Sequence, residues 1–123
     1  MILADTSVWI DFLRRGDAGF KELLCGGHIA MHDFVLGELS CGNLRDRQTN
    51  LAWFAQLPRV PAATNEEVLY FIEEAKLYGR RLGWVDLHLL ASARLNRVRV
   101  YTRDEPLSKA AADLAVVYDR ASS

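Results

Sequence analysis

Short, mostly apolar segments of four to five residues alternate along this chain with longer segments whose apolar residues recur at helical spacing. Short apolar runs bounded by polar or glycine residues are typical of buried strands, and strict alternation of apolar and polar residues is typical of half-buried ones. Strands are therefore predicted at residues 1–5, 28–31, 98–102 and 115–118.

The segments between these predicted strands have the composition and periodicity of helices. The predicted ranges are 8–14, 20–24, 33–42, 44–57, 64 to 79 or beyond, 85–95 and 107–114. Asp33 is interpreted as the N-cap of the third helix. Thr64 and Glu67 have the capping-box spacing that opens the fifth. Strands that alternate with helices predict a mostly parallel sheet flanked by helices, which is an α/β sandwich.

Composition limits the class of protein without naming a function. The chain has 123 residues, of which 50% are hydrophobic and 25% charged, so a single folded domain over residues 1–123 is expected. The first residues show no basic leader and no long apolar stretch, which predicts a cytoplasmic protein without a membrane span. Cys25 and Cys41 form no C-x-x-C pair and are expected to be reduced and buried. The net charge of -1 means that any contact with nucleic acid must be local.

Four acidic residues fall where a parallel sheet places its ligand-binding residues. Asp5 and Asp104 follow predicted strands, Glu38 lies on the helix after the second strand, and Asp86 begins an otherwise apolar helix. The carboxyl ends of parallel strands meet at one edge of a sheet, so these side chains can converge there. Two like charges about 4 Å apart repel by about 4 kcal/mol at an effective dielectric near 20, so a cation is expected to compensate them.

This acidic cluster predicts metal-dependent hydrolysis of a phosphodiester. Carboxylate oxygens are the ligands that Mg²⁺ and Mn²⁺ prefer, and such an ion can activate water and neutralise a leaving oxygen. Ser7 and Thr102 are expected to hold a ligating carboxylate in place. Arg103 neighbours Asp104 and is the candidate contact for a substrate phosphate.

Four segments carry a resemblance to a known family. They are Asp-Thr-Ser-Val-Trp-Ile-Asp-Phe-Leu at residues 5–13, Gly-Glu-Leu at 37–39 with Gly42, Asp-Leu-His-Leu-Leu-Ala-Ser-Ala at 86–93, and Tyr-Thr-Arg-Asp at 101–104. In this order and spacing the chain resembles the PIN-domain nucleases, and more narrowly the VapC toxins of bacterial toxin-antitoxin pairs. The resemblance extends from Met1 to about Tyr118.

The resemblance implies a fold, an activity and partners. It implies a PIN-like three-layer sandwich and an endoribonuclease toxin whose Asp5, Glu38, Asp86 and Asp104 are catalytic and hold Mg²⁺ or Mn²⁺. In this family pattern Thr102 matches the hydroxyl that precedes the last acid. The family also implies an RNA substrate, a homodimer, and a VapB-type antitoxin whose tail covers the active site.

Other interpretations of the same residues remain open at this point. Each acid taken alone can be a helix cap or a solvated side chain, and Asp11 is expected to face solvent. His88 is expected to pack within the fold or at an interface. A receiver-type phospho-acceptor module has the same length and alternation, but it requires an acidic pair after the first strand and a lysine after a late one. A protein that only binds a partner is the third alternative.

Overall fold

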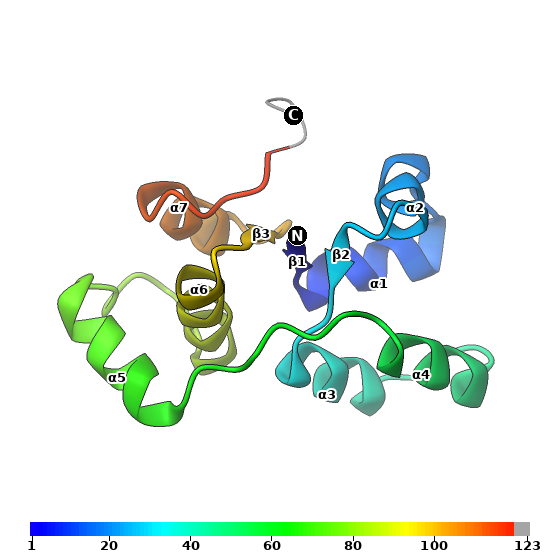
Figure 1. Cartoon of the computed structure of the whole chain (residues 1–123), viewed down its shortest axis with the longest axis horizontal. Coiled ribbons are helices and arrows are strands. Elements are labelled where there is room, and N and C mark those ends of the chain that lie inside the picture. Colours follow the sequence, from blue (N-terminus) through cyan, green and yellow to red (C-terminus); the bar gives the residue numbers. More distant parts are fainter. Residues whose placement is uncertain (120–123) are drawn as a thin grey trace.

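A three-stranded parallel sheet lies at the centre of the computed structural model, which describes residues 1–119 (Figure 1). The strands are β1 (Ile2–Ala4), β2 (Ile29–Ala30) and β3 (Arg99–Tyr101), in the order β2-β1-β3. Leu3 of the central strand pairs with Ala30 on one side and with Val100 on the other. Both pairings are parallel, which confirms the predicted type of sheet.

Helices flank this sheet on two sides. Figure 1 shows α5, α6 and α7 on one side of the strands and α1 to α4 on the other. Their bounds are α1 (Thr6–Arg15), α2 (Ala18–Cys25), α3 (Asp33–Cys41), α4 (Arg47–Ala55), α5 (Asn65–Glu74), α6 (Trp84–Asn96) and α7 (Glu105–Asp113). The predicted α/β sandwich is therefore correct.

The buried indole of Trp9 joins three helices on one side of the sheet. Its ring lies edge-on to Phe20 of α2, with centroids 5.0 Å apart, and to Phe54 of α4, at 5.1 Å. All three side chains are fully buried, so they act as the core that fixes α1, α2 and α4 against one another.

The helix predicted at 44–57 spans only Arg47–Ala55. Two other predicted elements are also shorter than expected, and the same type of helix ending explains both. Lys76 after α5 and Ala115 after α7 adopt left-handed φ angles of 52° and 60°. The next residue in each case, Leu77 or Val116, donates its backbone N–H to a carbonyl five residues back, which is the Schellman arrangement. The fifth helix therefore ends at Glu74 and not at residue 79 or beyond. The predicted strand at 115–118 is reduced to one bridge between Val100 and Val117.

Three smaller expectations need correction or confirmation. The N-cap of α3 is His32, whose Nδ1 accepts from the backbone N–H of Phe34 at 3.0 Å, so the assignment of Asp33 as cap is wrong by one residue. Cys25 and Cys41 are free thiols, as expected, but both are exposed. Among residues 1–119, no helix is both long and apolar enough to cross a membrane.

Candidate active site

The end of β1 and the end of β3 meet where the predicted site lies. The backbone N–H of Asp5, directly after β1, donates to the carbonyl of Tyr101, the last residue of β3, at 2.9 Å. Because the two strands are parallel and adjacent, residues 5–7 and 102–104 leave the sheet side by side. The register of the sheet therefore places Asp5 beside the loop that carries Asp104.

The carboxylate of Asp5 is buried and held by hydroxyl groups from both segments. Its Oδ1 accepts from Ser7 Oγ at 2.5 Å and from the backbone N–H of Ser7 at 2.9 Å, which makes Asp5 the N-cap of α1. Its Oδ2 accepts from Thr102 Oγ1 at 2.6 Å. Both carboxylate oxygens are thus fixed in direction, in the way that positioning groups orient a reactive or metal-binding carboxylate.

Ser7 and Thr102 also brace the loop after β3. Ser7 Oγ accepts from the backbone N–H of Arg103 at 3.0 Å, and Thr102 Oγ1 accepts from that of Asp104 at 2.9 Å. The two hydroxyls therefore contact Asp5 and the backbone of the next predicted site residues at the same time. This is the location that the sequence predicted for them; their role in a reaction stays a prediction.

The other three acids come from three further elements, and each accepts a hydrogen bond from another group of the protein. Glu38, on α3, accepts from Thr6 Oγ1 at 2.6 Å, which ties α3 to the first turn of α1. Asp86, in the first turn of α6, accepts from the backbone N–H of Gly83 at 3.0 Å. Asp104 is the N-cap of α7 and accepts from the backbone N–H of Leu107 at 3.0 Å.

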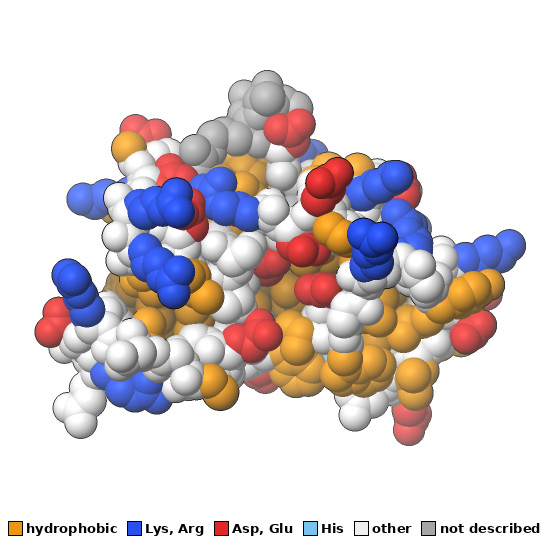
Figure 2. Space-filling view, turned by 180° about the vertical axis from the view of Figure 1, so that it is seen from behind, with side chains coloured by type: hydrophobic (Ala, Val, Ile, Leu, Met, Phe, Trp, Pro, Cys, Tyr) orange, Lys and Arg blue, Asp and Glu red, His pale blue; other side chains and the backbone are white. Residues whose placement is uncertain are grey.

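The four carboxylates are close enough to act on one another electrostatically. Burial raises the pKa of Asp86 above its usual value, a hydrogen bond from Gly83 opposes that rise, and the negative charges of Asp104, Asp5 and Glu38 add to it. Figure 2 shows a face of the molecule on which acidic side chains gather near a central hollow, with lysine and arginine side chains on both sides. The charges of three acids from separate segments therefore act on the fourth, Asp86, and disfavour its ionised form.

The donor set fits a hard divalent cation in its chemistry, although the side chains are not yet arranged as a coordination shell. Within residues 1–119, no group of three or more histidine, cysteine, aspartate or glutamate side chains is arranged so that it could hold a metal ion. Asp86, Glu38 and Asp104 turn instead to donors of the protein itself. The cluster nevertheless offers only oxygen ligands and an uncompensated negative charge, which is the combination that Mg²⁺ and Mn²⁺ favour.

Arg103 has partners that the sequence did not indicate. Its Nε lies 2.9 Å from Asp11 Oδ2, and its Nη2 lies 3.2 Å from Asp17 Oδ2, so it ties the loop after β3 to α1 and to the N-cap of α2. The expectation that Asp11 faces solvent is wrong, since its side chain is 26% exposed and paired with this arginine. The contacts of Asp11, Asp17 and Thr6 were not predicted, because no local pattern links them to residues so distant in the chain.

The fold and the site together define one class of protein. It is a parallel α/β sandwich with acidic residues gathered at the carboxyl edge of its sheet. Residues 2–113 match the PIN domain family, and the chain belongs to that family. The resemblance carried by the four sequence segments is thereby confirmed.

The chain is also similar to curated proteins of known name. It is 42% identical over 117 residues to "Ribonuclease VapC32" of Mycobacterium tuberculosis, strain CDC 1551 / Oshkosh, and the match covers 94% of each chain. The protein of the same name in strain ATCC 25618 / H37Rv matches with the same identity and coverage.

Proposed function

We propose that this chain is an endoribonuclease, the toxin of a toxin-antitoxin pair, and that it hydrolyses RNA phosphodiesters at the cluster formed by Asp5, Glu38, Asp86 and Asp104. The observation that carries the proposal is the convergence of these acids from four elements. Burial raises the pKa of Asp86 most, and the nearby negative charges of Asp104, Asp5 and Glu38 raise it further. Like charges held together cost folding free energy unless a ligand offsets the repulsion. The similarity to the two ribonucleases supports RNA as the substrate.

The same four carboxylates are the residues that would hold Mg²⁺ or Mn²⁺. When bound, such an ion supplies Lewis-acid chemistry, because it makes water a better nucleophile at neutral pH and stabilises charge on the phosphate oxygens. The residues around it are already in position: Ser7 and Thr102 orient Asp5, and Thr6 orients Glu38. These hydroxyls keep the acids in place before a substrate arrives, which lowers the cost of reorganisation during the reaction.

The proposed activity comes with partners and a location. Arg103, 43% exposed in its side chain, is the proposed contact for a substrate phosphate, and that contact requires exchange of its pairs with Asp11 and Asp17. A VapB-type antitoxin is proposed to cover the site in the inactive state. The chain is further proposed to act as a homodimer in the cytoplasm.

The experiment that tests the proposal is cleavage of total RNA by the purified chain, with the ends of the products sequenced. Asp5→Asn should reduce cleavage by at least about a hundredfold, because losing even a group that only orients a metal ligand costs 10- to 100-fold. The fold should survive, since asparagine caps a helix as well as aspartate does. Circular dichroism and a thermal melt check the fold, and EDTA gives the metal-free control.

A matched control makes the same chemical change on a carboxylate outside the cluster. Asp113 pairs with Arg80 on the surface, at 2.7 Å, and Asp113→Asn should cleave as the native chain does. Equal cleavage by Asp5→Asn and Asp113→Asn would remove the assigned site. No metal-dependent cleavage by folded, antitoxin-free protein would overturn the proposed activity.

A further inference from the structure

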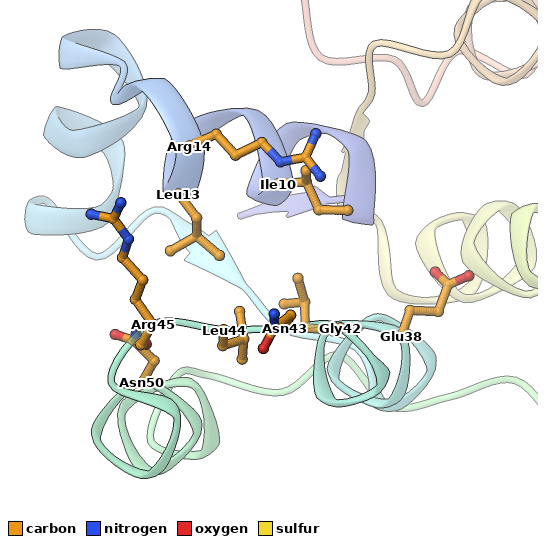
Figure 3. A pocket seen from close by; sticks show the side chains of 10 residues that line it. Ile10, Leu13, Arg14, Glu38, Gly42, Asn43, Leu44, Arg45 and Asn50 are labelled. Carbon is orange, nitrogen blue, oxygen red and sulfur yellow. Dashed lines mark hydrogen bonds between the residues drawn. The ribbon is translucent and has the colours of Figure 1, made fainter.

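A cavity opens beside the carboxylate cluster, between the C-terminal half of α1 and the connection from α3 to α4. Its volume is about 330 Å³, and Glu38 lines it together with Ile10, Leu13, Arg14, Asn43 and Arg45. Figure 3 shows Ile10, Leu13 and Arg14 on the α1 side, Asn43 and Leu44 on the opposite side, and Glu38 at one end. The cavity therefore begins at a residue of the proposed catalytic cluster and extends away from it.

The side chains of two arginines of this cavity have no partner among the described residues 1–119. Six of the eleven arginines in the described part of the chain use their side chains in an ion pair or a hydrogen bond. The side chains of Arg14 and Arg45 are among the five that make neither to residues 1–119. Both side chains are exposed and come from opposite walls of the cavity. They form a positively charged rim next to a negatively charged cluster, in a chain whose net charge is only -1.

The interior of the cavity combines apolar surface with the side-chain amide of Asn43. Ile10, Leu13 and Leu39 provide the apolar walls. The side chain of Asn43 makes no hydrogen bond to residues 1–119, so its amide offers both a donor and an acceptor to a ligand. Apolar walls with a few polar groups are typical of sites that bind small molecules.

The wall formed by residues 42–46 is held by hydrogen bonds and does not depend on a ligand. Arg47 Nη1 donates to the carbonyl of Gly42 at 2.9 Å, and its Nη2 donates to that of Ser40 at 2.5 Å. Asn50 Nδ2 donates to the carbonyl of Arg45 at 2.7 Å. These bonds preform the side of the cavity that carries Asn43 and Arg45.

We infer that this cavity binds one unpaired nucleotide of the RNA next to the cleavage site, with its base among the apolar walls and its flanking phosphates on Arg14 and Arg45. The inference rests on the proposed function, since it makes Glu38 the junction between the reacting phosphate and this subsite. The volume lies at the low end of the roughly 300–1,000 Å³ of small-molecule sites, so one nucleotide fits and a duplex does not. An unpaired base can turn out of the strand to enter such a cavity without the cost of breaking a base pair.

The charges favour a nucleotide over a protein segment as the occupant. An apolar peptide would use the leucine and isoleucine surface but would leave both guanidinium groups without a partner. A nucleotide uses both features, because its base covers the apolar walls and its phosphates pair with the arginines. Arginine planes can also stack on the base.

The test is binding of a fluorescently labelled single-stranded RNA of roughly ten nucleotides, followed by anisotropy at several salt concentrations. EDTA is present throughout, so that affinity is measured without metal-dependent cleavage. Arg14→Gln/Arg45→Gln should weaken binding by about a hundredfold and reduce the salt slope by about 1.4, since each phosphate contact on a single strand contributes about 0.7. Asn43→Asp, which adds a negative charge at nearly constant size, should also weaken it.

Arg99→Gln is the matched control. Arg99 is exposed and unpaired like the two arginines of the cavity, but it lies at the first residue of β3, at the opposite edge of the sheet. It should change the affinity by less than about threefold, because it meets the RNA only through long-range charge. A duplex of the same sequence should bind more weakly to the native chain than the single strand does.

The possible outcomes separate this subsite from the proposed activity. Binding lost in the cavity variants, from a native chain that cleaves nothing, would support the subsite and overturn the nuclease. If the native chain cleaves RNA but both cavity variants keep the native affinity and salt slope, the subsite alone is overturned. A protein segment would then be the better candidate for the occupant of the cavity. Equal affinity for duplex and single strand, or no RNA binding by the native chain, would also overturn it.

Discussion

Two polar clusters of this chain lie near the same sheet and differ in how completely their groups are matched. In the first, the buried His32 and Ser92 join β2, α3 and α6. In the second, four acids gather at the carboxyl edge of the sheet, and three of them repel the charge of Asp86. The groups of the first cluster find their hydrogen-bond partners within the protein, whereas the second cluster has an excess of negative charge.

In the cluster of His32 and Ser92, which is called the matched cluster here, the donor and the acceptor of each hydrogen bond can be assigned. Nδ1 of His32 accepts from the backbone N–H of Phe34, so Nε2 must carry the proton and donate to Ser92 Oγ, at 3.0 Å. Ser92 Oγ also accepts from the backbone N–H of Ala63 at 3.0 Å. Matched buried groups stabilise a fold, whereas an unmatched group of charges indicates where a ligand binds, and the two clusters should respond in opposite ways to mutation.

The largest expected effect within this comparison comes from Ser92→Ala. The change removes one acceptor and leaves two buried donors, His32 Nε2 and the backbone N–H of Ala63, without a partner. The free energy of unfolding should fall by about 3 kcal/mol, because each unpaired buried group costs about 1–3 kcal/mol. Urea denaturation measures the loss, and RNA cleavage per folded molecule should stay unchanged.

Ser40→Ala is the control for that variant. Ser40 Oγ donates only to the carbonyl of Leu36, one turn back in α3, so its loss should cost less than about 0.5 kcal/mol. If Ser92→Ala were as stable as Ser40→Ala, the two clusters would not differ in the way inferred here.

The second effect is a dependence of stability on pH. Burial lowers the pKa of His32 from 6.5 to about 4, and the hydrogen bond from Phe34 agrees with this direction because a protonated ring would direct a second N–H at that donor. The folded chain therefore binds fewer protons than the unfolded chain between these values. Stability should be complete above pH 6.5 and fall by up to about 3 kcal/mol as the pH drops towards 4.

Urea denaturation at several pH values checks this prediction. His88 contributes in the same direction, since burial lowers its pKa as well. His32→Asn should lower the stability at neutral pH but flatten its dependence on pH, because the titrating group is gone. A dependence as steep in this variant as in the native chain would show that His32 is not its source.

The smallest effect concerns Arg103, which lies at the boundary between the two kinds of cluster. Its charge is matched by Asp11 and Asp17, yet it follows directly on Thr102 at the acidic edge. Arg103→Ala should weaken RNA binding about tenfold and reduce the salt slope by about 0.7, as expected for a phosphate contact. Stability should change by less than about 1 kcal/mol, because exposed ion pairs contribute little.

Arg103→Lys keeps the charge and should keep the salt slope. If Arg103→Ala left both affinity and slope unchanged and lowered only the cleavage rate, Arg103 would be a positioning residue. In that case the charge of Arg103 would serve only its ion pairs with Asp11 and Asp17.

In this chain, features that depend on residues close in the sequence were predicted correctly, and features that depend on distant residues were not. Thr64 and Glu67 form the predicted capping box within four residues, and Asp5 and Asp104 stand after strands as expected. The cap of α3 was assigned to Asp33 because aspartate is a common N-cap. His32 takes that place only because Ser92, 60 residues away, holds its ring in the tautomer that accepts.

The sequence by itself determined the alternation of strands and helices, the segments that resemble the PIN domain, and the four acids that were candidates for one site. These features depend on periodicity and on bonds between near neighbours, which any short segment already contains. The tertiary structure alone decided that Thr102 donates to Asp5 across 97 residues, that Arg103 pairs with Asp17 across 86, and that a cavity adjoins Glu38. Such contacts depend on how the strands align and where the helices pack, which no local pattern of residues specifies.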